Sequence, residues 1–453
     1  MSKPIIVNKF GGGILTKELI PIMKKRIMEQ NKKGYQSIAV VSAMPKVTDE
    51  ILSFVESLKE NYEEIIVEKF INNLLLRHKQ VALDIHISKE YIANLNIELD
   101  KILGKLQLEL INTHHNSKSK NSIVTNALED KLVSYGEKLS AIIMTYYFNS
   151  NGIEAVQFLA EEIPIITDDH FKNANIDYLL SEKNLNHKIK NINCTIVIPG
   201  FTGITKDGEV ATLGRGGTDT TACFIGAALK AESVILWKDV GGVLSADPRI
   251  IKIAKTIPFI SYLEAEEAGK IIHDKAIQYV KMFKTDVEVS SIANPKLSTK
   301  IGEIKNRGRG AKILSVKKDL NLLLITDETL KLNDLLLIVS ESFKKHKVDE
   351  MILVSNTRYN LQIVAEKSTE IDKVFNEIKS KVEKIELIKV SMIFLVGNFI
   401  AKDISNFNDL LVKLDTDLQI SAFYFENCKR IEAVIRTENI EKIANSVYKK
   451  FIR

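Results

Sequence analysis

The stretch PIIVNKFGGG, residues 4–13, sets the pattern for the fold. A short apolar run leads into Lys9 and then into three consecutive glycines, and comparable apolar runs precede glycines or polar loops at residues 37–43, 194–200 and 233–237. Such runs suit strands that are buried on both faces, and their alternation with helical periodicity predicts an α/β domain with a mainly parallel sheet. Ligands bind such sheets at the carboxyl ends of the strands.

The composition is that of an ordinary globular protein. Of the 453 residues, 45% are hydrophobic and 27% charged, which excludes disordered, collagenous and coiled-coil classes. The 63 basic and 58 acidic residues leave a diffuse net charge of +5, too weak to indicate nucleic acid. The three cysteines lack metal spacing or a disulfide framework. No secretory signal or long apolar span is present, so we expect a cytoplasmic protein without a membrane partner.

The composition changes near residue 310. Every glycine except Gly397 lies at or before Gly310, and Pro295 is the last proline. The segment KNRGRGAK, residues 305–312, is the natural hinge. We therefore expect a catalytic domain over residues 1–305, and the charged stretch 46–116 is predicted to be a helical insertion on its edge.

The sequence after the hinge predicts the same order of strands and helices twice. A strand, a helix, two strands and a helix are predicted over residues 313–385, and the same order recurs over residues 386–453. The second copy includes a strand predicted at LQISAFYF, residues 418–425. Two small α+β modules of ferredoxin-like order follow from this pattern.

The first set of candidate functional residues is VNKFGGG, residues 7–13. A strand that ends in a lysine followed by glycines lets backbone N–H groups approach phosphate oxygens, with the ammonium adding a point charge. The segment matches neither a Walker A loop nor a Rossmann fingerprint, so a plain turn is the competing interpretation.

The second set is GFTG, residues 200–203, with ATLGRGGTDTTACFIGAAL, residues 211–229. The glycines enter a helix that we expect to be capped by Thr218 or Asp219. The helix N-terminus and Arg215 together form a candidate anion site, and Asp219 could hold either an ammonium group or the phosphate-binding lysine. The alternative is a simple N-cap aspartate beside a surface arginine.

The third set is SVILWKDVGGVLSADPRI, residues 233–250. A buried strand runs into Asp239, a turn at Gly241 and Gly242, and then Asp247-Pro248-Arg249, where the proline fixes the loop that presents the arginine. By itself this could be an ordinary turn with a salt bridge.

In this order and spacing the three sets resemble the aspartokinase family, whose pattern is KFGGTS, a VVSAM strand, GRGGSD and DVDGVYTADPR. The segments VVSAMPKVTDEIL, residues 40–52, and SYLEAEEA, residues 261–268, match as well, and the C-terminal modules look like the paired ACT domains of that family. The resemblance covers essentially the whole chain. It implies an amino-acid-kinase sheet sandwiched by helices and followed by two ACT modules.

The resemblance implies transfer of the ATP γ-phosphoryl group to the β-carboxylate of aspartate. The product would be 4-phospho-L-aspartate, which opens lysine, threonine and methionine synthesis. A carboxylate with a pKa near ~3.9 is already ionised at pH 7, so no general base is required. Mg²⁺ would arrive with ATP, without a protein metal site. The resemblance also implies a single-function, feedback-regulated enzyme, because no dehydrogenase domain follows, and a homodimer or larger homo-oligomer formed through the ACT modules, with lysine or threonine as effector.

The resemblance also assigns roles to individual residues. Lys9 and Asp219 would be catalytic, Glu137 would bind the aspartate ammonium group and Arg215 would clamp a substrate carboxylate. The implied substrate side comprises Ser42, Thr48, Glu137, Phe201, Arg215 and Thr218. The implied nucleotide side comprises Lys9, Phe10, Gly11, Gly12, Gly216, Gly217, Lys238, Asp239, Leu244, Asp247, Arg249 and Lys270. The implied effector contacts are Asn333, Val348, Asp349 and Glu350.

The sequence departs from the family pattern at several of these places. Gly13 and Ile14 replace the Thr-Ser pair, Lys238 stands where threonine is frequent, and Leu244 replaces a tyrosine. The usual glycine of the effector loop is missing, with Asn333 nearest. Two alternatives therefore stay open: a kinase of the same fold for another acidic acceptor, and a non-catalytic amino-acid sensor. The ACT modules could also serve only for dimerisation.

Overall fold

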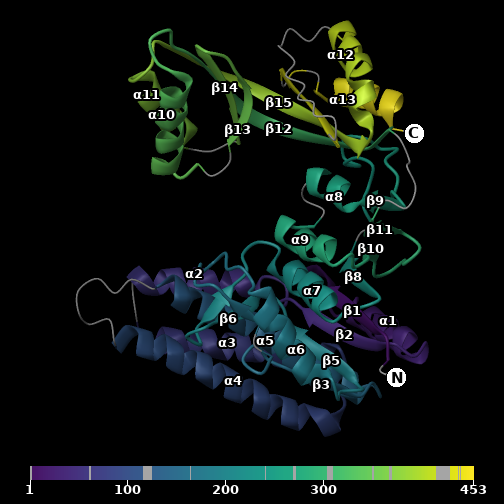
Figure 1. The fold of residues 1–453 in the computed structure, drawn as a ribbon. Helices are drawn as coiled ribbons and strands as arrows, with labels where there is room; N and C mark the ends of the chain where they lie inside the picture. The colour runs from purple at the N-terminus through teal and green to yellow at the C-terminus, as the bar shows by residue number, and fades with distance from the viewer. Residues whose placement is uncertain are drawn as a thin grey trace. The chain divides into compact units, whose positions relative to one another are not determined.

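The computed structural model describes residues 3–60, 63–115, 125–163, 165–239, 241–268, 272–303, 310–348, 351–366, 370–414, 429–436, 438 and 440–452 (Figure 1). The chain divides into two units. The first comprises Met1–Val243 and Thr256–Ile304, and the second comprises Leu244–Lys255 and Lys305–Arg453. The boundary after residue 304 coincides with the segment expected to be a hinge.

The first unit is built on an eight-stranded sheet with the order β3-β5-β2-β1-β8-β10-β11-β9. The strands from β3 to β10 are parallel, while β11 runs antiparallel to β10 and pairs in parallel with β9. The four apolar runs form β1, β2, β5 and β8, which confirms the predicted mainly parallel sheet. The strands are β1 Ile5–Phe10, β2 Gln36–Val41, β3 Ala155–Gln157, β5 Thr195–Pro199, β8 Ser233–Lys238, β9 Phe259–Ser261, β10 Val287–Ser291 and β11 Ser298–Gly302.

The first unit also contains a small three-stranded sheet, which contributes a residue to the candidate site. It pairs β4 (Ile166–Thr167) in parallel with β6 (Thr202–Thr205), and β6 antiparallel with β7 (Val210–Thr212). Gly203 of β6 is required there, because a Cβ atom at this position would lie 2.6 Å from the carbonyl oxygen of Ile165.

The predicted insertion is helical, as expected. It consists of α2 (Val47–Glu60), α3 (Glu64–Asp84) and α4 (Lys89–His115), whose apolar residues form one core with α5 (Asn126–Ser150). Helix α5 begins after the Thr125 cap, whose side chain accepts a hydrogen bond from the backbone N–H of Leu128. The other helices of this unit are η1 Gly12–Ile14, α1 Ile20–Lys32, α6 Tyr178–Ile189, α7 Gly217–Ala228, α8 Tyr262–Ala268 and α9 Asp274–Met282.

The second unit contains a five-stranded antiparallel sheet with the order β13-β14-β12-β15-β16. Its strands are β12 Gly310–Thr326, β13 Met351–Asn356, β14 Asn360–Ala365, β15 Lys384–Asn398 and β16 Arg430–Arg436. Its helices are α10 Leu332–Lys345, α11 Ile371–Lys379, η2 Ile400–Asp403, α12 Ile404–Lys413 and α13 Ile440–Phe451. The strand predicted at residues 418–425 lies outside the described residues.

The long strands β12 and β15 serve two hydrophobic cores. Leu323 on the later half of β12 packs in a core with α10 and α11, whereas Leu314 on its earlier half packs in a core with α12 and α13. A register shift between Lys317 and Leu320 separates the two halves. The first strand of the repeat thus packs with helices that come more than 85 residues later in the sequence.

The loop Leu244–Lys255 belongs to the second unit although it lies within the catalytic range of the sequence. Ala246 and Ile251 are buried in the core of α12 and α13. The carbonyl oxygen of Ser245 accepts a hydrogen bond from the N–H of Leu314 at 2.8 Å, and its hydroxyl lies 2.7 Å from that of Tyr448. This loop is therefore packed as part of the second unit.

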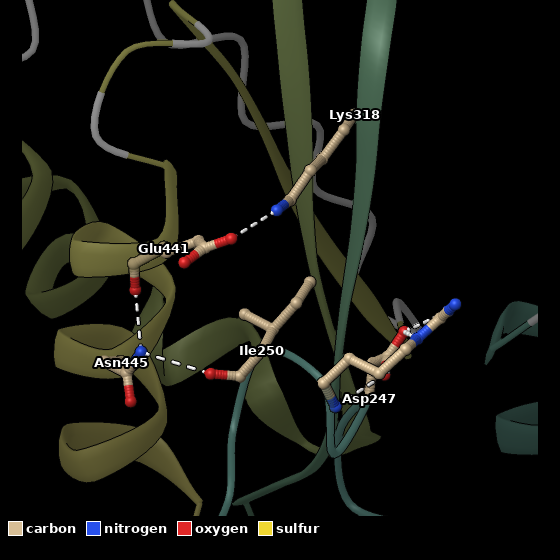
Figure 2. Close-up of polar contacts among 6 residues, drawn as sticks. Asp247, Ile250, Lys318, Glu441 and Asn445 are labelled. Atoms are coloured by element: carbon tan, nitrogen blue, oxygen red, sulfur yellow. Dashed lines mark hydrogen bonds and ion pairs between the residues drawn. The ribbon is translucent and has the colours of Figure 1, made fainter.

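Helix α13 also holds the loop through its polar face (Figure 2). The side chain of Asn445 donates hydrogen bonds to the carbonyl oxygens of Ile250, at 3.3 Å, and Glu441, at 2.8 Å. The carboxylate of Glu441 pairs in turn with Lys318 of β12 at 2.7 Å. One helix thus links the loop to the sheet.

Ile251→Ala is expected to lower the free energy of unfolding of the second unit by about 2–4 kcal/mol, because it leaves a cavity in a packed core. Ile253, in the same loop, is 60% exposed, so Ile253→Ala should change that free energy by less than about 0.5 kcal/mol. Hydrogen exchange of the α13 amides, measured at increasing denaturant concentrations, gives both changes in the free energy of unfolding. Equal effects of the two substitutions would contradict the packing of this loop.

Candidate active site

A cavity of about 800 Å³ opens in the first unit at the carboxyl ends of its strands. Lys9 lies near the end of β1, Ser42 directly follows β2, and Phe201 follows β5. This is the edge at which ligands bind parallel sheets. The predicted residues found in the cavity wall are Lys9, Gly11, Gly12, Ser42, Thr48, Glu137, Phe201, Arg215, Gly216, Gly217, Thr218 and Asp219.

Lys9 and Asp219 form a buried ion pair. Their side-chain nitrogen and oxygen lie 2.7 Å apart, and Lys238 approaches the second carboxylate oxygen at 3.6 Å. Burial lowers the pKa of Lys9, against the attraction of Asp219. Burial alone would raise the pKa of Asp219, but the two ammonium groups hold it below its ordinary value. Of the two partners left open for Asp219, the structure shows the lysine of the glycine loop, Lys9.

The glycines after β1 leave room that side chains would occupy. A Cβ atom at Gly11 would lie 2.9 Å from the Lys9 nitrogen, and one at Gly12 would lie 3.1 Å from the carbonyl oxygen of Ala43. At Gly13 a Cβ atom would meet nothing within 4 Å, so the family's threonine would fit there. The open space beside the ammonium group fits phosphate oxygens.

Helix α7 adds a second anion-binding element to the same cavity. Its N-cap is Gly216, in the left-handed region with φ 72°, and the helix begins at Gly217. The expectation that Thr218 or Asp219 caps the helix is therefore wrong: both lie in the first turn, because the glycine makes the left-handed bend. The Thr218 hydroxyl instead accepts a hydrogen bond from Ser42 at 2.8 Å.

Glu137 is a buried carboxylate in the wall of the cavity. It is 4% exposed, and its Oε2 atom has no hydrogen-bond partner among the residues that the structure describes. Burial raises the pKa of Glu137 to about 8. The side chain lies close to the segment after β2, because its carboxylate accepts a hydrogen bond from the backbone N–H of Ala43. A buried carboxylate that has no ion-pair partner among the described residues can bind a cationic group.

Arg215 and Phe201 form another wall of the cavity. Arg215 is exposed, and its guanidinium group has no ion-pair partner within the described part of the chain. Phe201 has a φ of 73°, which is strained for a residue with a side chain, and its N–H donates to the Thr221 hydroxyl at 3.0 Å. Its ring packs where a Cβ atom of Gly217 would lie.

Several predicted nucleotide residues lie elsewhere. The Phe10 side chain is fully buried against Trp237. Asp239 is exposed after β8, while Lys270 lies outside the described residues. Leu244, Asp247 and Arg249 belong to the second unit, where Asp247 and Arg249 pair at 2.6 Å. Of the predicted effector residues, Asn333 is exposed at the start of α10, Val348 is buried, and Asp349 and Glu350 lie outside the described residues.

The cavity wall also contains residues that sequence reasoning missed. Asp130 and Val133 of α5 line it together with Glu137, while Lys172 lines it from a loop and Thr212 from the end of β7. The spacing of Asp130, Val133 and Glu137, by three and four residues, places them on one helix face and was the available signal. No local pattern indicated Lys172 or Thr212.

Within the described part of the chain, no group of three or more histidine, cysteine, aspartate or glutamate side chains is arranged to hold a metal ion. None of the described helices is long and apolar enough to cross a membrane.

Comparisons with known proteins agree with this fold. The model of the amino acid kinase family matches residues 4–291. An aspartokinase of Rickettsia felis is 27% identical over 399 residues, covering 85% of this chain and 99% of the relative. One of Rickettsia bellii is 30% identical over 339 residues, covering 73% of this chain and 68% of the relative.

Solved structures share the fold along nearly the whole chain. Escherichia coli aspartokinase III, solved with lysine and aspartate, superposes with a TM-score of 0.80 at 20% identity, covering 99% of this chain and all of that one. The aspartate kinase of Clostridium acetobutylicum gives a TM-score of 0.77 at 22% identity, covering 99% of this chain and 100% of that one. The chain belongs to the amino acid kinase family. Within that family it is a member of the aspartokinases.

Proposed function

We propose that the protein transfers the γ-phosphoryl group of ATP to the β-carboxylate of L-aspartate. The observation that carries this proposal is the composition of one cavity. It combines a buried carboxylate and an arginine, neither with an ion-pair partner among the described residues, and a lysine beside a glycine loop and a helix N-terminus. These groups are complementary to the ammonium and carboxylate groups of an acidic amino acid and to a phosphate.

The amino-acid acceptor would be bound through its ammonium group and through a carboxylate. Glu137 binds its ammonium group, which satisfies the Oε2 atom that otherwise lacks a partner. Arg215 binds a carboxylate through its planar pair of donors. Ser42, Thr48 and Thr218 line the space between them and offer hydroxyl groups.

In the transfer step, an oxygen of the ionised β-carboxylate attacks the γ-phosphorus as the bond to the ADP oxygen breaks. Because the nucleophile is already an anion, no proton is removed, and catalysis depends on positioning and charge stabilisation. Lys9 stabilises the charge on the transferring group, and Asp219 holds the ammonium of Lys9 in place. Mg²⁺ bound to ATP would shield the phosphate charges. We assign Gly11, Gly12, Gly216 and Gly217 to backbone contacts with the phosphates.

For the second unit we propose two ACT-like modules, expected over residues 313–385 and 386–453, that bind an amino-acid effector and support self-association. The two modules share β12, because its earlier half packs with α12 and α13 and its later half packs with α10 and α11. The order of strands and helices in this unit supports the assignment. Lysine or threonine is the proposed effector.

The test is turnover of Mg-ATP by the purified protein with aspartate, trapping the acyl phosphate with hydroxylamine. Glutamate and N-acetylglutamate serve as alternative acceptors, and lysine and threonine are added in parallel. Aspartate-dependent hydroxamate supports the proposal. Turnover only with another acceptor, or amino-acid binding without any turnover, would overturn it.

Arg215→Lys keeps the positive charge but loses the bidentate donor pair. We expect the KM for aspartate to rise by about tenfold or more and the KM for ATP to change by less than about twofold, since the guanidinium group is assigned to the acceptor. Steady-state kinetics with each substrate varied in turn provides the measurement. Equal changes in both values would contradict the assignment.

A further inference from the structure

One buried carboxylate forms hydrogen bonds with two separate segments of the cavity wall. Asp130 of α5 is 2% exposed. Its Oδ2 atom accepts hydrogen bonds from the backbone N–H groups of Lys172 and Thr212, each at 2.7 Å, and its Oδ1 atom accepts one from the Thr212 hydroxyl at 2.9 Å. The carboxylate therefore connects α5 to two segments that are 40 or more residues away in sequence.

Both segments held by Asp130 lead to the Arg215 loop. Thr212 is the last residue of β7, three positions before Arg215. Gly214 has a φ of 76°, and a Cβ atom there would lie 2.9 Å from the carbonyl oxygen of Lys172 and 2.8 Å from the side-chain oxygen of Asn173. The Arg215 loop consequently packs directly on the segment that Asp130 holds.

The Lys172 segment is strained and held from several sides. Lys172 has a φ of 66°, a conformation that persists only where surrounding contacts enforce it. Its ammonium group pairs with Glu129 at 2.8 Å, beside the hydrogen bond to Asp130. The next residue, Asn173, accepts hydrogen bonds from Lys275 through both its backbone and side-chain oxygens, at 2.7 and 2.6 Å.

We propose that Asp130 is a positioning residue that fixes the Arg215 loop and thereby sets the affinity for the acceptor carboxylate. The inference rests on the proposed function in one respect, the role of Arg215 as the carboxylate clamp. The three donors of Lys172 and Thr212 occupy three of the roughly four acceptor positions of the Asp130 carboxylate, so its hydrogen bonds serve mainly to hold these two segments. A small displacement of a binding group is enough to weaken a bidentate contact strongly.

Asp130→Asn removes the negative charge and one of the two acceptor oxygens, so the charge-assisted bonds are lost and at most two of the three donors keep an oxygen acceptor. We expect the KM for aspartate to rise by about tenfold, with kcat and the KM for ATP within about threefold of wild type. Thr212→Val removes only the hydroxyl bond, so a smaller rise in the same direction is expected. A change in the KM for ATP as large as that for aspartate would overturn the proposal.

Ser181→Ala is a matched control in the same unit. The buried Ser181 hydroxyl bonds to the N–H and the carbonyl oxygen of Ile166, and Ser181 does not line the cavity. Loss of the Ser181 hydroxyl should lower the free energy of unfolding without altering the KM for aspartate. If Ser181→Ala raises that KM as much as Asp130→Asn does, general destabilisation explains the effect and the positioning role is wrong.

A double-mutant cycle shows whether Asp130 acts through Arg215. In an Arg215→Ala background, Asp130→Asn should cause little further rise in the KM for aspartate, since the group that it positions is gone. Fully additive effects would overturn the proposal.

Hydrogen exchange at the amides of Lys172 and Thr212 gives a readout that does not need activity. In Asp130→Asn we expect exchange at these amides, and across residues 213–216, to be at least tenfold faster than in the wild type. Unchanged exchange would mean that Asp130 does not hold the loops. If exchange accelerates but wild-type protein neither binds nor phosphorylates aspartate, the proposed function fails and the carboxylate-affinity part of this inference fails with it.

Discussion

Lys9→Met is expected to lower kcat for aspartate phosphorylation by between about a hundredfold and a thousandfold. The ammonium group of Lys9 is 2.7 Å from Asp219 inside the cavity and is the cation next to the glycine loop, where charge on the transferring phosphoryl group must be stabilised. Methionine retains the length and apolar contacts of the stem, so the loss isolates the charge. Single-turnover phosphorylation with saturating substrates measures the chemical step directly.

A matched control for Lys9→Met is Lys138→Met. Lys138 is also buried and paired with a carboxylate, that of Glu161, but it does not line the cavity. Both substitutions should lower stability, because each leaves a carboxylate without its closest cation. Only Lys9→Met should abolish the fast chemical step. A near-wild-type rate in Lys9→Met would remove Lys9 from the catalytic machinery.

Glu137→Gln is expected to raise the KM for aspartate by about a hundredfold, since a neutral amide replaces the buried carboxylate that we propose binds the ammonium group. Because the pKa of Glu137 is raised to about 8, most of the empty sites are protonated at pH 7. The wild-type KM for aspartate should therefore fall roughly tenfold between pH 7 and pH 9, as the carboxylate ionises. Kinetics across this range should show no such fall for the variant; a wild-type KM that stays flat would contradict the assignment.

The same shift predicts how stability depends on pH. The folded-state pKa of Glu137, about 8, lies above its ordinary value of 4.5, so the folded protein binds more protons than the unfolded chain between these values. The contribution of Glu137 to stability therefore falls as the pH rises through this window. Relative to wild type, Glu137→Gln should gain roughly 2–4 kcal/mol of unfolding free energy between pH 5.5 and pH 8.5.

Denaturant titrations of wild type and Glu137→Gln at the two pH values measure this gain. Replacement of the exposed Glu154 by glutamine is the control for the loss of one carboxylate at the surface. If wild type and Glu137→Gln respond to pH in parallel, Glu137 is ionised in the folded protein throughout the window, and the predicted fall in the KM for aspartate between pH 7 and pH 9 is wrong.

Part of the candidate site could be predicted from short patterns. Apolar runs followed by glycines indicated the strands of the parallel sheet, and those strands place Lys9 and Ser42 at the same edge. The cap of α7 could not be predicted from side-chain preferences, because Gly216 makes the turn through its backbone freedom. Asp130 was missed since its three hydrogen-bond donors come from distant segments.

The sequence by itself determined the secondary-structure elements and whether each is a helix or a strand. Local periodicity and glycine placement act over a few residues, and they were sufficient for the parallel sheet, the helical insertion and the repeat after the hinge. The tertiary structure alone decided that β12 serves two cores, that Leu244–Lys255 packs in the second unit, and that Glu137 has a raised pKa. The reason is physical: burial and hydrogen-bond partners depend on which distant segments come into contact, and a local sequence pattern does not specify those contacts.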